Sequence, residues 1–89
     1  MGKNERNYFA EGIKSATQAM IFFTHAKAEA IKTMDLTSAY SAEKREEEQA
    51  LSVGRASNAS GIPVPNEVKV VLDRIQGRIE TKKGEPVLA

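Results

Sequence analysis

The chain has 89 residues, 13 of them basic and 12 acidic, and it contains no cysteine. The missing thiols exclude disulfides and thiolate zinc sites, and a net charge of +1 gives no overall attraction to nucleic acids or anionic lipids. A domain of this size buries only about 60–65% of its unfolded surface. We therefore expect residues 1–89 to form one domain with a thin stability margin, compensated by unusually good packing or by self-association.

Residues 4–34 carry an apolar repeat that is typical of an amphipathic helix. Its members are Phe9, Ile13, Ala16, Met20, Phe23, Ile31 and Met34. On a helical wheel these residues fall within one sector about 80° wide, which predicts a helix roughly 45 Å long. Lys27 stands at the break in this repeat.

The apolar surface of this first helix is broader than one neighbouring helix needs. Tyr8, Ala19, Phe22 and Ala26 extend it, and Gly12 lies within it, where a missing side chain lets another backbone approach. We therefore expect the helix to contact two neighbours, one of them from a second copy of the chain or from another protein. The predicted apolar interface consists of Phe9, Ile13, Met20, Phe22, Phe23 and Ile31.

The only histidine, His25, falls on the opposite, polar side of this helix. Glu29 lies one turn further along, and such a pair could bind a metal weakly or transfer a proton. A metal site needs further ligands that the sequence does not offer. We interpret His25 as a solvent-exposed residue beside a favourable carboxylate, and we expect no metal. Ile21 points to the same polar side without an evident reason.

A second helix is expected over residues 37–54, because the stretch 35–38 offers three capping side chains. Its apolar face is interrupted in the middle by Glu43, Glu46 and Glu47. Burying these carboxylates without paired cations would be costly. We therefore expect the centre of this helix to face solvent, where the three glutamates form a charged interface for a basic partner surface.

Residues 55–65 are expected to form a linker followed by an extended strap. The linker, RASNASG, is rich in small residues that favour turns. In the strap, Pro63 and Pro65 restrict the backbone to an extended conformation. Ile62 and Val64 are placed to lie along the core.

A third helix is predicted over residues 66–83. Asn66 is a good N-cap, Gly84 favours termination, and residues 84–89 then form a tail. The helix carries a narrow apolar stripe that must cover the first helix or a partner. This stripe consists of Val68, Val71, Leu72, Ile75 and Ile79.

No pattern in the sequence indicates catalysis or a cofactor. It has neither a phosphate-binding loop nor a nucleophile elbow. The N-terminus does not resemble a secretory signal, and the longest strongly apolar run, residues 19–23, is too short to span a membrane. We predict a cytoplasmic, non-enzymatic, all-α bundle of three helices. It would act as a homodimer, or as a small inhibitor, adaptor or assembly subunit that binds a larger protein.

The alternative function is DNA or RNA binding by the third helix. Its basic residues are Arg74, Arg78, Lys82 and Lys83. A recognition helix reads bases with a few side chains and contacts phosphates with others. Acidic residues on the same helix, such as Asp73, disperse the charge, so protein interaction is the preferred interpretation.

Overall fold

The structure of the chain, a computed structural model, describes residues 3–84, with side chains for residues 4–79. Over this range the chain forms three α-helices and no strand. They are α1 (Lys3–Lys32), α2 (Leu36–Ser60) and α3 (Asn66–Gly84). The predicted all-α architecture with a long first helix is confirmed. Gly84, the first residue of the predicted tail, is the last residue of α3, and residues 85–89 lie beyond the described part of the chain.

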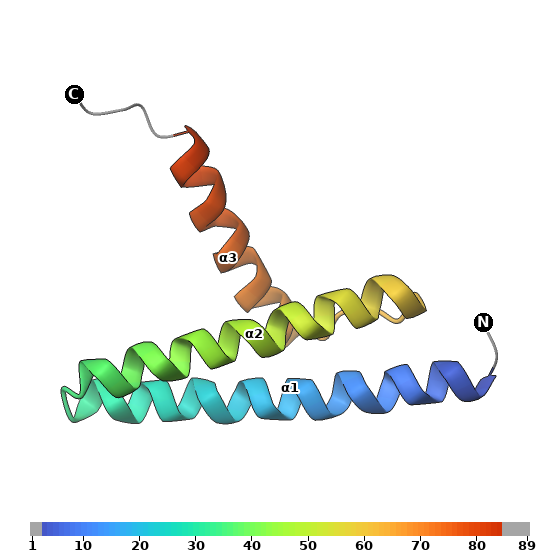
Figure 1. Cartoon of the computed structure of the whole chain (residues 1–89), viewed down its shortest axis with the longest axis horizontal. Helices are drawn as coiled ribbons and strands as arrows, with labels where there is room; N and C mark the ends of the chain where they lie inside the picture. The colour runs from blue at the N-terminus through green and yellow to red at the C-terminus, as the bar shows by residue number, and fades with distance from the viewer. Residues whose placement is uncertain (1–2, 85–89) are drawn as a thin grey trace.

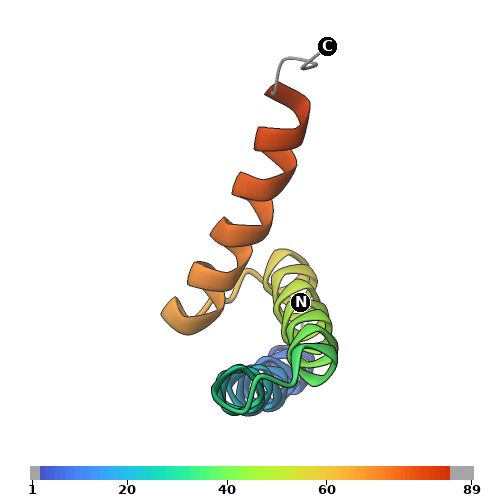
Figure 2. The same ribbon diagram turned by 90° about the vertical axis from the view of Figure 1, so that its left-hand side faces the viewer.

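The three helices do not close into a compact bundle. α1 and α2 lie antiparallel as a hairpin, whereas α3 starts against one face of the hairpin and projects past α2 (Figure 1, Figure 2). The radius of gyration is 15.6 Å, against about 12 Å for a compact domain of this length. The molecule measures 52 × 35 × 16 Å, and a single helix is already about 10–12 Å thick. Large parts of the helices therefore have no neighbour on one side.

Two matching rows of side chains hold the hairpin together. In α1 the row consists of Phe9, Ile13, Ala16, Met20, Phe23, Lys27 and Ala30. In α2 it consists of Ala39, Ala42, Glu46, Gln49, Val53, Ala56 and Ser60. Both rows alternate steps of three and four residues, as in coiled-coil packing. This seven-residue repeat carries the row in α1 through Lys27 to Ala30. Ile31, which was expected in the row, is consequently exposed.

The turn between α1 and α2 closes both helix ends with local hydrogen bonds. Met34 adopts a left-handed φ of 59°, and the Asp35 N–H donates to the Ala30 carbonyl at 2.8 Å, which terminates α1 in a Schellman motif. The Asp35 carboxylate then caps α2 by accepting hydrogen bonds from the Ser38 hydroxyl at 2.6 Å and the Ser38 N–H at 3.1 Å. These two bonds lower the pKa of Asp35.

α2 extends six residues beyond its predicted end, so the prediction of a linker over residues 55–60 is wrong. The small residues there are compatible with a helix, and Ala56 and Ser60 continue its buried row. The helix ends at Gly61, whose φ of 75° is strained for residues with a side chain. The extended strap therefore begins only after Gly61. Ile62 and Val64 pack against the core, as expected.

The core lies where the first half of α3 rests on the hairpin. Its buried residues are Ile13, Met20, Ala50, Val53, Val68 and Val71. α2 and α3 lie close together at Gly54, where a Cβ atom would make an ordinary van der Waals contact of 3.6 Å with a methyl carbon of Leu72. Ile21 packs against this cluster as well, which explains an apolar residue on the side of α1 expected to be polar. The second half of α3 projects beyond this support, so Ile79 is largely uncovered.

Candidate protein-interaction surface

Glu46, at the centre of α2, is buried rather than solvated, with only 1% of its surface exposed. Its carboxylate accepts a hydrogen bond from the Thr24 hydroxyl and one from the Arg74 guanidinium, and the Lys27 ammonium lies 3.6 Å away. The expectation that the centre of α2 faces solvent is therefore wrong. The paired cations that burial requires come from the helices on either side, α1 and α3.

Two opposing effects act on the Glu46 carboxyl. Burial alone would raise its pKa, because it disfavours the charged form. The hydrogen bonds from Arg74 and Thr24, together with the positive charges of Arg74 and Lys27, outweigh burial and lower the pKa. The ionised carboxylate of Glu46 on α2 therefore connects all three helices, through Thr24 and Lys27 of α1 and Arg74 of α3.

The other two glutamates of the predicted charged interface also have partners within the chain. Glu43 lies 3.8 Å from the Lys27 ammonium. Glu47 accepts hydrogen bonds from Arg78 at 2.8 Å and from Arg74 at 3.4 Å. The three glutamates thus do not form a free acidic surface, because Glu46 and Glu47 bind α3 and Glu43 pairs with α1.

The same contacts bear on the nucleic-acid alternative. Arg74 and Arg78 each bind carboxylates of α2, so their charge is largely neutralised within the chain. Phosphate contacts by these arginines would have to compete with Glu46 and Glu47. The side chains of Lys82 and Lys83 lie outside the described residues.

The six residues of the predicted apolar interface divide into three groups. Ile13 and Met20 are buried inside the chain and cannot contact a partner. Phe9 and Phe23 are half-buried between α1 and α2. Phe22 and Ile31 are exposed, by 65% and 54%. Ile31 lies near the turn between α1 and α2. Of the six residues, only Phe22 is both exposed and near the middle of α1.

A second exposed aromatic residue, Tyr8, accompanies Phe22 on the same side of α1. Tyr8 is 77% exposed and stands edge-to-face against Phe9, with ring centroids 5.9 Å apart. Phe22 repeats this arrangement with Phe23 at 5.4 Å. Residues 8 and 22 are two seven-residue repeats apart, so they share one side of a helix in coiled-coil packing. In each pair one ring packs in the hairpin and the other points out.

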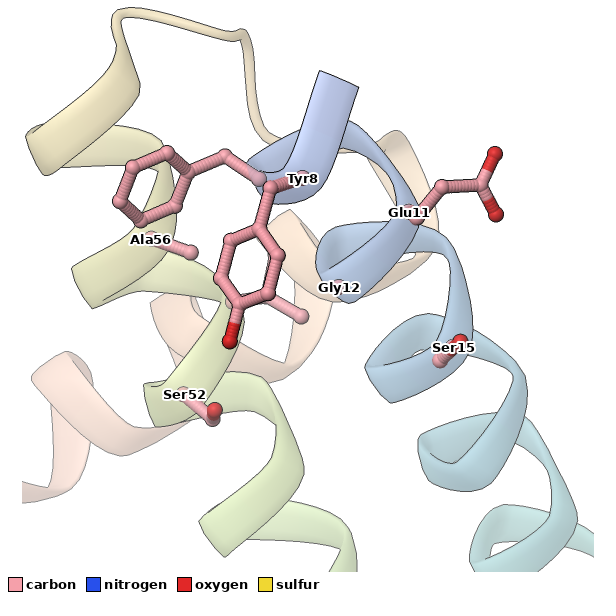
Figure 3. Close-up of a pocket in the computed structure, with 8 residues that line it drawn as sticks. Tyr8, Glu11, Gly12, Ser15, Ser52 and Ala56 are labelled. Atoms are coloured by element: carbon pink, nitrogen blue, oxygen red, sulfur yellow. The ribbon is translucent and has the colours of Figure 1, made fainter. Parts of the chain in front are cut away.

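Between these two rings the surface is lined by small residues and contains a groove. We use the term open face for the side of the hairpin that carries Tyr8, Gly12, Ser15, Ala19 and Phe22 of α1 and Ser52 of α2. The groove has a volume of about 360 Å³ between the two helices, and Val53 and Ala56 contribute to its lining. In Figure 3 the Tyr8 ring lies over the space between the helices, the Glu11 carboxylate points away from it, and α3 runs behind the hairpin.

Gly12 keeps this groove open without serving a contact inside the chain. A Cβ atom at Gly12 would meet no other atom within 4 Å. Glycine in a helix interior costs about 0.5–1 kcal/mol relative to alanine. Within the described chain, no helix packs closely enough at Gly12 to require a glycine there. A glycine without such a contact is expected where a helix of another molecule approaches.

The open face was only partly predictable. The sequence indicates its breadth through Tyr8, Phe22 and Gly12, but the predicted interface omitted Tyr8 and included the buried Ile13 and Met20. The seven-residue repeat that continues through Lys27 is the signal that separates the packed row from the open face.

Other classes of site find little support among the described residues. Among the side chains described, those of residues 4–79, no three histidine or acidic groups lie closely enough together to hold a metal ion, and His25 lies exposed on α1. None of the three helices, over the part described, combines the length and apolar character needed to cross a membrane. Comparison of the chain with protein-family models, curated proteins and solved structures found no match.

Proposed function

We propose that this chain is a non-catalytic interaction protein that binds protein surfaces through the open face of its helical hairpin. Self-association is the simplest form of this function, and a larger protein partner would use the same face. The observation that carries the proposal is the pair of exposed rings on the open face, Tyr8 and Phe22, together with the unfilled groove beside Tyr8.

The area of these rings makes association energetically reasonable. An aromatic side chain offers about 200 Å², so the exposed fractions of Tyr8 and Phe22 amount to roughly 280 Å² per chain. Burying the four rings of two chains would contribute at most about 14 kcal/mol at 25 cal/mol per Å². The loss of translational and rotational freedom opposes this by about 4–15 kcal/mol. The balance favours a reversible complex over a permanent one.

The charged residues of α2 have a different role in this proposal. Glu43, Glu46 and Glu47 neutralise cations of α1 and α3. Glu46 and Glu47 hold α3 on the face of the hairpin opposite to the groove. The open face is thereby left free for a partner.

Multi-angle light scattering of paired variants tests the proposal. The wild-type chain should show a concentration-dependent mass above 9.7 kDa. Phe22→Asp should weaken self-association at least about 30-fold, because it removes roughly 2 kcal/mol or more of apolar contact. Val70→Asp is the matched control, because Val70 is similarly exposed, at 69%, but lies on α3.

The outcomes separate the two forms of the proposal. A wild-type chain that stays monomeric at millimolar concentration would refute self-association and leave only a different protein as partner. A Val70→Asp variant that dissociates as readily as Phe22→Asp would show that the open face is not the contact surface.

A further inference from the structure

We propose that two copies of this chain pair through the open face with their α1 helices antiparallel, about a two-fold axis at Ser15. The inference rests on the proposed function and specifies its partner, a second copy of this chain. In this arrangement each Phe22 meets Tyr8 of the other copy, at the mouth of the other copy's groove.

The open face carries both a projecting group and a cavity. Phe22 projects from one end of the face, and the groove beside Tyr8, Gly12 and Ser52 occupies the other end. A groove of about 360 Å³ has room for a phenyl ring. Each copy has one projecting ring and one groove. In an isologous pair, the ring of each copy therefore meets the groove of the other copy, and neither ring nor groove is left for a third copy.

The exposed aromatic residues of α1 are placed symmetrically about Ser15. Tyr8 and Phe22 lie seven positions before and after Ser15, about 10 Å in each direction along the helix. An antiparallel copy centred there places Tyr8 against Phe22 twice. Gly12 and Ala19, near the centre, are small enough for the two helices to approach closely.

The same register also matches polar residues at the edges of the face. Asn4 lies eleven residues before the centre and His25 ten residues after it, on the same flank of the face, so Asn4 of one copy faces His25 of the other and the two side chains can form a hydrogen bond. On the same flank, Glu11 faces Gln18 of the other copy rather than another carboxylate. No like charges stand directly opposite one another among these pairs, so the polar edges do not oppose the register.

The pairing of two open faces buries enough area for a specific interface. The register overlaps α1 from residue 4 to residue 26, a length of roughly 33 Å. The hairpin is two helices wide, or about 20 Å, so the overlap covers on the order of 650 Å² per copy. The total of about 1,300 Å² falls within the range of specific protein interfaces. A contact along α1 alone would cover about half of this area and fall short of that range.

Single-cysteine cross-linking tests the arrangement, because the native chain has no cysteine. Ser15, Asn4 and His25 are all exposed, so cysteine at these positions leaves the core intact. Ser15→Cys should form a covalent dimer with a short thiol cross-linker. Asn4→Cys and His25→Cys should not cross-link alone, because identical residues lie about 30 Å apart. Mixed together, these two variants should cross-link to each other. Val70→Cys on α3 is the control for random collision.

The expected yield for Ser15→Cys is at least about ten-fold above that of Val70→Cys, since pairing raises the local thiol concentration. Light scattering on the same samples distinguishes the possible failures. A dimer in which Asn4→Cys and His25→Cys each cross-link to themselves would be parallel, which overturns this inference but leaves self-association standing. A dimer without a Ser15→Cys product would use another surface. A monomer would overturn both the inference and the self-association on which it rests.

Discussion

The buried carboxylate of Glu46 makes a specific prediction about stability. Arg74→Met removes the guanidinium that lies 2.5 Å from this carboxylate and leaves the charge in a site that is 1% exposed. Glu46→Leu instead removes the charge and leaves Arg74, whose side chain is 38% exposed and can turn toward water. We therefore expect the arginine substitution to be the more damaging of the two.

The size of each loss in stability depends on the contacts that remain around Glu46 or Arg74 when the other is replaced. Removing one partner of a fully buried pair costs about 3–5 kcal/mol. Lys27 at 3.6 Å and the Thr24 hydroxyl still stabilise Glu46, and water reaches the arginine side. We therefore expect Arg74→Met to lower the free energy of unfolding by about 2 kcal/mol, and Glu46→Leu by about 1 kcal/mol. The double variant should lie within about 0.5 kcal/mol of the wild type, because replacing both charges with apolar groups is nearly neutral.

Urea denaturation followed by circular dichroism at 222 nm measures all four free energies under one set of conditions. The coupling between the two positions should be about 2 kcal/mol or more, well above the error of the method. A double variant that is as unstable as the sum of the two single variants would show that the groups act independently. In that case Glu46 would not tie α3 to the hairpin.

Three further predictions concern pH and glycine. The lowered pKa of Glu46 stabilises the folded chain above the ordinary value of 4.5, so stability should fall as pH drops below about 4.5 and through the folded pKa. In Glu46→Gln the free energy of unfolding should fall less between pH 7 and pH 3, as measured by urea denaturation at a series of pH values. Gly12→Ala should raise the free energy of unfolding, measured on the dilute monomer, by about 0.5–1 kcal/mol, because the added methyl group improves helix propensity and meets nothing. Gly61→Ala should lower it by about 1 kcal/mol, since its φ of 75° disfavours a side chain. If Gly12→Ala and Gly61→Ala changed the free energy of unfolding by the same amount in the same direction, the roles assigned to the two glycines would be wrong.

The helices were predictable because local signals agree with the fold. Asp35 caps α2 as expected, and the apolar spacing of α1 and α3 identifies their packed sides. The end of α2 was missed because RASNAS contains no residue that a helix excludes, and small residues alone do not terminate one. Gly61 supplies the actual end through its left-handed backbone.

The centre of α2 could not be predicted from its own residues. Glu46 can be buried only because Lys27 on α1 and Arg74 on α3 meet at it, and these partners are 19 and 28 positions away in the sequence. The apolar interface was misjudged for a related reason. A straight wheel places Ile31 with the packed residues, whereas the seven-residue repeat of a supercoiled hairpin selects Ala30 and frees Ile31.

Dilution of isotope-labelled protein, followed by amide chemical shifts, tests most directly whether the open face binds a second copy. Between millimolar and micromolar concentration, the account predicts that the amide signals of Tyr8, Gly12, Ser15 and Phe22 shift together while that of Val70 stays fixed. Signals that do not change with concentration, or changes centred on Val70 and Ile79 of α3, would contradict it.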